Sequence, residues 1–175
     1  MTIPSTRAQA AGAERPSFAG VAEAHLDDVH AYLVYLTRDR VLAEDLTADT
    51  FEKALRGWHR FDPRRASART WLCQIARTTA LDWFRAEERR RRRDQATARE
   101  DRAEPVFGEG LSPELESALR SLTHSEREVI ALRVLLDLDG DEAARVLGIS
   151  PTNVSTRLSR ALKKLEEKVG THVLA

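Results

Sequence analysis

The chain has 175 residues, of which 42% are hydrophobic and 32% charged, with only 8 Gly and 6 Pro. This composition is typical of a soluble, mainly helical protein and excludes a fibre or a fully disordered chain. No apolar run approaches the roughly 20 residues that a membrane-spanning helix needs, and residues 1–17 lack the apolar segment of a signal peptide. We therefore expect a cytoplasmic protein with a disordered N-terminus over residues 1–17.

Charge is unevenly distributed, although the 28 basic residues equal the 28 acidic ones. Acidic residues dominate residues 21–55, and basic residues dominate 56–93. A second basic cluster lies near the C-terminus and consists of Arg157, Arg160, Lys163 and Lys164. Two separate basic surfaces suit a protein that contacts a polyanion at two places, because each neutralised phosphate releases a counterion. Ordinary solvated helix faces would give the same pattern, so this alternative stays open.

Residues 18–93 carry three apolar stripes at helical spacing and predict three packed helices. The stripes are Val29, Leu33 and Leu36; Leu42, Leu46, Thr50, Ala54 and Trp58; and Leu72, Ile75, Ala76, Thr79 and Trp83. The pattern favours a core position for Trp83. Cys73, the only cysteine, lies in the third stripe and is predicted to be a buried thiol rather than a reactive one.

Residues 94–111 lose this periodicity and gather charge, Gly and Pro, which predicts a flexible linker. A second helical domain is then predicted over 112–170, with a tail at 171–175. Thr123 and Glu126 have the spacing of a capping box, and the sequence Gly148-Ile149-Ser150-Pro151 ends one helix and starts the next. Two helices joined by such a turn indicate a helix-turn-helix. The predicted fold is therefore all-α, with two small domains.

The last helix has an apolar stripe that includes Val154, Leu158 and Ala161, and its opposite face is polar. Short hydrogen-bonding side chains come first on that face and cations follow, as in a helix that reads base edges and holds phosphates. An ordinary amphipathic helix also has a polar face. The residues predicted to contact duplex DNA are Thr152, Asn153, Thr156, Arg157, Arg160 and Lys163.

The strings AEDLTADTFEKAL, residues 43–55, and TWLCQIARTTALDWFR, residues 70–85, resemble the region 2 motifs of the extracytoplasmic-function (ECF) sigma factors of the sigma-70 family. The C-terminal domain is similar to region 4 of that family. The sequence departs from the family pattern at Ala48, where Gln is usual, at Thr78, where Asn is common, and at Pro151. The resemblance implies a factor that binds core RNA polymerase, directs it to minus-10 and minus-35 promoter elements, and melts the promoter.

The resemblance also implies partners and site residues. Region 2 would contact the clamp helices of the largest polymerase subunit, region 4 would contact the flap of the second-largest subunit, and an anti-sigma factor would regulate the protein. The motif positions that match polymerase-binding residues are Asp45, Leu46, Asp49 and Phe51. Those expected to contact the minus-10 DNA are Arg64, Arg65, Ser67, Arg69, Trp71 and Arg77.

The sequence leaves three rivals to this function. A stand-alone helix-turn-helix regulator would bind duplex DNA without polymerase, and a protein that only sequesters partners would not need two DNA-facing surfaces. An enzyme is disfavoured because the five histidines are scattered without metal-ligand spacing, and because a nucleophile motif and a Gly-rich phosphate loop are both absent from the sequence. We expect no catalytic residue, metal or cofactor.

Overall fold

The computed structural model describes residues 16–93 and 112–173, with side chains described as far as residue 170. The helices are α1 (Phe18–Thr37), α2 (Arg40–Gly57), the 3-10 turn η1 (Trp58–Arg60), α3 (Ala68–Arg93), α4 (Pro113–Arg120), α5 (His124–Ile130), the π-turn η2 (Ala131–Leu135), α6 (Gly140–Leu147) and α7 (Pro151–Val173). These residues contain no strand, and the predicted all-α fold is confirmed. The predicted linker, 94–111, and most of the predicted N-terminal segment lie outside the described residues.

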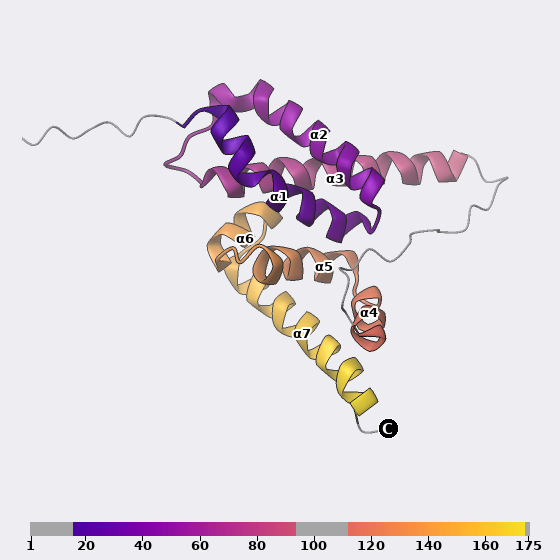
Figure 1. The fold of residues 1–175 in the computed structure, drawn as a ribbon. Coiled ribbons are helices and arrows are strands. Elements are labelled where there is room, and N and C mark those ends of the chain that lie inside the picture. Colours follow the sequence, from indigo (N-terminus) through magenta and orange to yellow (C-terminus); the bar gives the residue numbers. More distant parts are fainter. Residues whose placement is uncertain (1–15, 94–111, 174–175) are drawn as a thin grey trace, which may run out of the picture.

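Helices α1, α2 and α3 form the N-terminal module (Figure 1). Its core includes Tyr32, Leu33 and Leu72, which are fully buried. Asp39 caps α2 by accepting a hydrogen bond from the backbone N–H of Leu42 at 3.1 Å, which ends the tight turn after α1. The three predicted apolar stripes therefore locate the three helices correctly.

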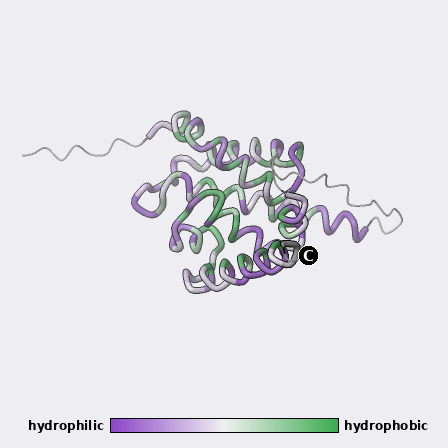
Figure 2. The backbone as a smooth tube through the Cα atoms, turned by 60° about the horizontal axis from the view of Figure 1, so that its bottom comes forward, coloured by the Kyte–Doolittle hydropathy of each residue, from purple (hydrophilic) through white to green (hydrophobic). Residues whose placement is uncertain are grey.

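The predicted core position of Trp83 is wrong, because this side chain is 36% exposed. Its ring lies edge-on to that of Phe84 on the same helix, with ring centroids 5.4 Å apart. Helix α3 extends beyond α1 and α2 at its C-terminal end (Figure 1), so positions toward that end have fewer partners to cover them. Figure 2 shows the same end of the helix as strongly hydrophilic.

Helices α4 to α7 form the C-terminal module, in which α7 packs against α4, α5 and α6. The predicted capping box at the start of α5 is present, with Thr123 and Glu126 bonded reciprocally. The helix before α7 ends at Gly148, whose φ of 67° is left-handed, a conformation that glycine adopts without steric cost. Ser150 then caps α7 by accepting from the N–H of Asn153 at 3.2 Å. The predicted helix-turn-helix is thus formed by α6 and α7.

The two modules pack directly against each other, a contact that the sequence did not predict. Helix α3 lies against α6, and α1 lies against α5 and η2. The buried apolar side chains of both modules form one continuous cluster, and Figure 2 shows the hydrophobic segments gathered inside the molecule. The chain is therefore closed, with the first turns of α3 facing the C-terminal module.

Candidate functional site

Helix α2 presents an acidic outer face. Asp45 and Asp49 are exposed one turn apart, and Phe51 is half-buried. Leu46, which was predicted to bind polymerase with them, is only 2% exposed and belongs to the core. A partner that docks on α2 would meet the two carboxylates, while Leu46 holds the helix in place.

The segment between α2 and α3 combines an aromatic cluster with exposed cations. The rings of Trp58 and Phe61 stack at 4.8 Å, and Trp71 packs against both, at 5.7 Å from Trp58 and 5.2 Å from Phe61. Phe61 is only 5% exposed and Trp71 is half-buried. These rings therefore support the loop more than they offer open faces for stacking.

The loop itself is shaped by Asp62, whose side chain accepts from the backbone N–H of Arg64 at 3.0 Å. This local bond is typical of an Asx turn. The side chain of Arg64 is 92% exposed, and Arg65 is exposed as well. Both cations thus face solvent at the tip of the loop, where they can reach an anion.

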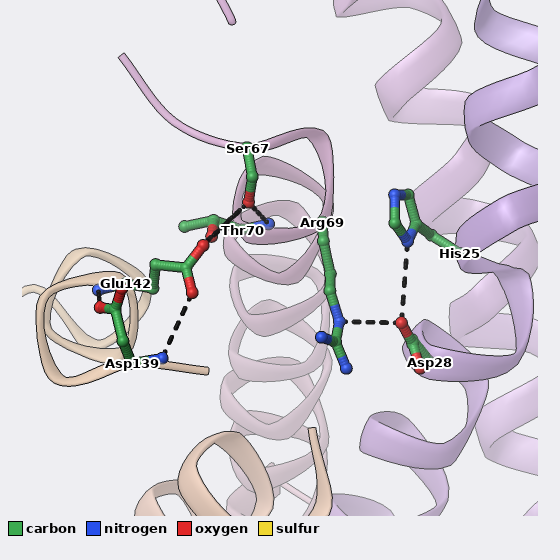
Figure 3. Close-up of polar contacts among 7 residues, drawn as sticks. All are labelled: His25, Asp28, Ser67, Arg69, Thr70, Asp139 and Glu142. Atoms are coloured by element: carbon green, nitrogen blue, oxygen red, sulfur yellow. Dashed lines mark hydrogen bonds and ion pairs between the residues drawn. The ribbon is translucent and has the colours of Figure 1, made fainter. Parts of the chain in front are cut away.

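Arg69 has a different setting, because its Nε lies 2.8 Å from Oδ2 of Asp28 on α1 (Figure 3). His25 approaches the same oxygen at 3.7 Å. The side chain of Arg69 is 29% exposed. This predicted DNA residue is therefore held by an ion pair inside the N-terminal module.

Ser67 caps α3 by accepting a hydrogen bond from the backbone N–H of Thr70 at 3.2 Å. The hydroxyls of Ser67 and Thr70 both donate to Oε1 of Glu142 on α6 (Figure 3). The two distances to the carboxylate are 3.0 Å from Ser67 and 2.9 Å from Thr70. Glu142 also closes the capping box of α6, accepting from the N–H of Asp139 at 3.2 Å. One carboxylate therefore bridges the positive N-terminal ends of two helices.

Arg77 is also drawn into the contact between the modules. Its Nε donates to Oε1 of Glu128 at 2.8 Å, and the two side chains are 25% and 3% exposed. Burial raises the pKa of the Glu128 carboxyl, but the neighbouring His124 and Arg77 outweigh burial and hold this pKa below its ordinary value. The carboxylate therefore stays charged and keeps Arg77 in place.

An open pocket of about 300 Å³ lies between α2 and α3. Lys53, on its α2 side, donates to Thr79 Oγ1 at 3.1 Å. The lining residues are Lys53, Trp71, Gln74, Ile75, Thr78, Thr79 and Asp82, and of these only Trp71 was predicted to contact a partner. All of them lie within the two strings that resemble region 2 motifs, but only their placement in space shows that they line one pocket.

On α7 the predicted DNA face is open to solvent. Its exposed members are Thr152, Asn153, Thr156, Arg160 and Lys163, and Arg157 is half-buried. Val154 and Ala161, on the opposite side, are 1% and 0% exposed. Short polar side chains in the first turns of a helix are suited to contacts with bases, and cations further along are suited to contacts with phosphates.

Within the described parts of the chain, no group of His, Cys, Asp or Glu side chains could hold a metal ion. The helices of the same segments include none that is long and apolar enough to cross a membrane. The candidate sites are thus surfaces of charged and hydrogen-bonding groups on α2, α3 and α7.

Comparison with known proteins assigns both modules. Residues 21–90 match Sigma-70 region 2, and residues 112–165 match Sigma-70 region 4. The ECF RNA polymerase sigma factor SigX of Bacillus subtilis is 32% identical over 151 residues, which cover 80% of this chain and 77% of SigX. SigM of the same organism is 28% identical over 151 residues, covering 81% of this chain and 88% of SigM.

Among solved structures, CnrH in complex with the cytosolic domain of CnrY is similar, with a TM-score of 0.64 and 25% identity, over 88% of each chain. The sigma factor RpoE, solved with the anti-sigma factor NepR from Bartonella quintana, shares the fold with a TM-score of 0.76 at 24% identity, over 87% of this chain and 96% of that one. Regions 2 and 4 in one chain do not support a stand-alone regulator. The protein belongs to the ECF RNA polymerase sigma factors of the sigma-70 family, which direct polymerase to promoters.

Proposed function

We propose that this sigma factor binds the clamp helices of the largest polymerase subunit through the acidic face of α2, with Asp45 and Asp49 making the direct contacts and Phe51 adding apolar area. Both carboxylates are exposed on one side of the helix. Charged groups in such positions guide association and fix the register of the bound partner. Leu46 supports the contact from the core, and region 4 would meet the flap of the second-largest subunit.

The minus-10 element is assigned to the start of α3 and the loop before it. Melting costs about 1–2 kcal/mol per base-pair step, which a factor without ATP must recover by holding the separated strand. Arg64 and Arg65 are the most accessible cations of the set and would make the first phosphate contacts. Ser67, Arg69, Trp71 and Arg77 would complete the contact with the strand.

The minus-35 element is assigned to α7, and the observation that carries the whole proposal is the open polar face of this helix. Thr152, Asn153 and Thr156 lie in its first turns and would read base edges in the major groove. Arg157, Arg160 and Lys163 follow and would hold the phosphates. Regions 2 and 4 would each bind DNA weakly. Because both are held on one polymerase, binding of the second promoter element becomes intramolecular, so promoters that carry both elements at the right spacing are bound most tightly.

An anti-sigma factor is the expected regulator. The similar chains CnrH and RpoE were each solved with a bound protein, and NepR is named an anti-sigma factor. Such a partner would cover the acidic face of α2 and so exclude polymerase.

The assignment is tested by binding core polymerase and DNA separately. Asp45→Arg with Asp49→Arg is expected to lower the affinity for core polymerase at least tenfold in a titration with fluorescently labelled protein, because two attractive charges become repulsive. Glu166→Arg, an exposed charge change on α7, is the matched control and should bind normally. Equal binding by both variants would remove α2 from the polymerase interface.

The proposed minus-35 contacts are tested with the variants Asn153→Ala and Arg160→Ala. Transcription is measured from promoters that the wild-type holoenzyme uses. Asn153→Ala should relax selection at one minus-35 position, and Arg160→Ala should weaken all promoters and reduce the salt dependence by about one phosphate contact. Wild-type behaviour of both variants would exclude α7 as the minus-35 reader.

A further inference from the structure

A cluster of cations lies where the end of α1 meets the turn between α4 and α5. Arg38, the residue that follows α1, donates from Nη2 to the backbone oxygen of Arg120 at 3.2 Å. Arg127 on α5 donates from Nη1 to the backbone oxygen of Leu122 at 2.7 Å. The two acceptors belong to the same turn, between the end of α4 and the start of α5. These bonds therefore fix two guanidinium groups, one from each module, at a single turn.

The three arginines of this turn lie close enough to affect one another's charge. Burial lowers the pKa of Arg38, and the neighbouring Arg120 lowers it further. Burial also lowers the pKa of Arg127, and here Arg38 adds to the effect. Nearby like charges disfavour the charged form of a group. The cations therefore repel one another, and a bound anion would relieve this repulsion.

The carboxylates nearest to Arg127 are shared with other cations. Glu126 and Glu128 both raise the pKa of Arg127. The carboxylate of Glu126 lies 3.0 Å from Lys164, however, and that of Glu128 lies 2.8 Å from Arg77. In addition, Nε of Arg127 is buried and has no hydrogen-bond partner among the residues that the structure describes. A buried donor without an acceptor is costly, so a ligand that supplies one would bind favourably.

The donors of the cluster fit a phosphate group. A guanidinium presents its N–H groups in a planar fork that matches two oxygens of a phosphate. Burial raises the pKa of Tyr35, which faces Arg38 and Arg127, to about 12, so its hydroxyl keeps its proton at neutral pH. Arg38 and Arg127 are half-buried, and the side chain of Arg120 is 49% exposed. A small anion can therefore reach the cluster from solvent.

We propose that Arg38, Arg120 and Arg127 form a binding site for the phosphate groups of a small ligand, such as a nucleoside di- or triphosphate. The ligand would bridge α1 with α4 and α5, and it would stabilise the folded protein as its concentration rises, because it binds the folded chain and not the unfolded one. The site is separate from the promoter contacts proposed above, which use none of these three arginines.

The site is tested by isothermal titration of the full-length protein with pyrophosphate. Sodium chloride keeps the ionic strength constant, because salt screens exposed charges. Wild-type protein should bind one pyrophosphate with a saturable heat. Arg38→Gln with Arg120→Gln should lower the affinity at least tenfold, since loss of one charge-assisted hydrogen bond corresponds to about a tenfold change in an equilibrium constant. Gln at position 38 still carries an amide donor for the backbone oxygen that Arg38 binds, so the turn is kept.

Arg56→Gln with Arg60→Gln is the matched control, because it also removes two exposed or half-exposed positive charges. Arg56 pairs with Glu52 at 2.5 Å and a spacing of four residues, as Arg120 pairs with Glu116. The control should bind pyrophosphate as tightly as wild-type protein does. Heat that does not saturate, or equal affinities of the two double variants, would overturn the proposal.

Thermal unfolding gives a second readout and distinguishes the sources of phosphate. The unfolding midpoint of wild-type protein should rise with pyrophosphate and with GTP, and that of Arg38→Gln with Arg120→Gln should stay constant. A larger rise with GTP than with pyrophosphate at equal concentration would assign the site to a nucleotide, and equal rises would assign it to the phosphates alone. Binding to a DNA duplex that the same variant weakens, without any effect of pyrophosphate or GTP, would assign the arginines to the DNA backbone and overturn the small-ligand site.

Discussion

Arg77 of region 2 and Glu128 of region 4 form an ion pair across the two modules, with Nε and Oε1 2.8 Å apart. The carboxylate is 3% exposed and the guanidinium 25%. Tyr32 on α1 and His124 on α5 also face this carboxylate. A buried charge of this kind depends on its partner, because its desolvation is offset only while the pair is intact.

Replacing Arg77 alone should therefore destabilise the protein. Arg77→Ala leaves the Glu128 carboxylate without the donor that lies 2.8 Å from it, and a buried group that loses a partner costs about 1–3 kcal/mol. Arg77→Met with Glu128→Leu should recover most of this loss, since both charges are removed together. Chemical denaturation measures the difference, and an equally unstable double variant would show that packing, not charge, accounts for the effect.

The stability of the closed form should fall at acid pH through Glu128. Its pKa lies below the ordinary value of 4.5, so its stabilising contribution is fully present above pH 4.5 and is lost as the pH falls through the folded-state pKa. The groups that face it are Arg77, His124, Tyr32 and Arg127. Denaturation followed between pH 7 and pH 3 should show a smaller loss for Glu128→Gln, and parallel curves for both proteins would contradict this assignment.

Cys73 should be inert in the folded protein. Its side chain is 0% exposed, and burial raises its pKa to about 12. At pH 8 only about one thiol in ten thousand would be ionised, and the thiolate is the reactive form. A chromogenic disulfide reagent should therefore react at the rate of unfolding, and at full speed in denaturant; rapid reaction of the native protein would contradict the burial of this residue.

The turn before α7 should depend on glycine at position 148. With φ at 67°, Gly148→Ala places a Cβ in a left-handed conformation and should cost about 1–2 kcal/mol. Gly170→Ala, inside α7 with no atom within 4 Å of the added Cβ, should stabilise by about 1 kcal/mol or less. Calorimetry compares the two, and equal effects would rule out strain at the turn.

Local features of the fold could be predicted from the sequence because they depend on neighbouring residues. The capping box of Thr123 and the turn from Gly148 to Pro151 need only a few side chains in fixed order. The prediction that Trp83 lies in the core was wrong because the burial of this side chain depends on how far α1 and α2 extend along α3. The exposed polar face of α7 could be predicted because the apolar stripe on its opposite side, which includes Val154 and Ala161, is buried; its contacts with DNA stay a prediction.

The contact between modules could not be predicted for a related reason. Ser67, Thr70, Gln74 and Arg77 form a polar stripe, and a polar stripe usually faces solvent. Its carboxylate partners, Glu128 and Glu142, follow more than 50 residues later and bear no motif that marks them as contacts between the modules. The polar stripe of α3 and the two glutamates become partners only because the two modules are packed against each other.

The central claim, that this chain directs polymerase to promoters, is tested most directly by run-off transcription from fragmented genomic DNA with bacterial core polymerase, with and without the protein. The account predicts new transcript starts that share two upstream elements at a fixed spacing. An unchanged set of starts, together with specific duplex binding by the protein alone, would contradict it.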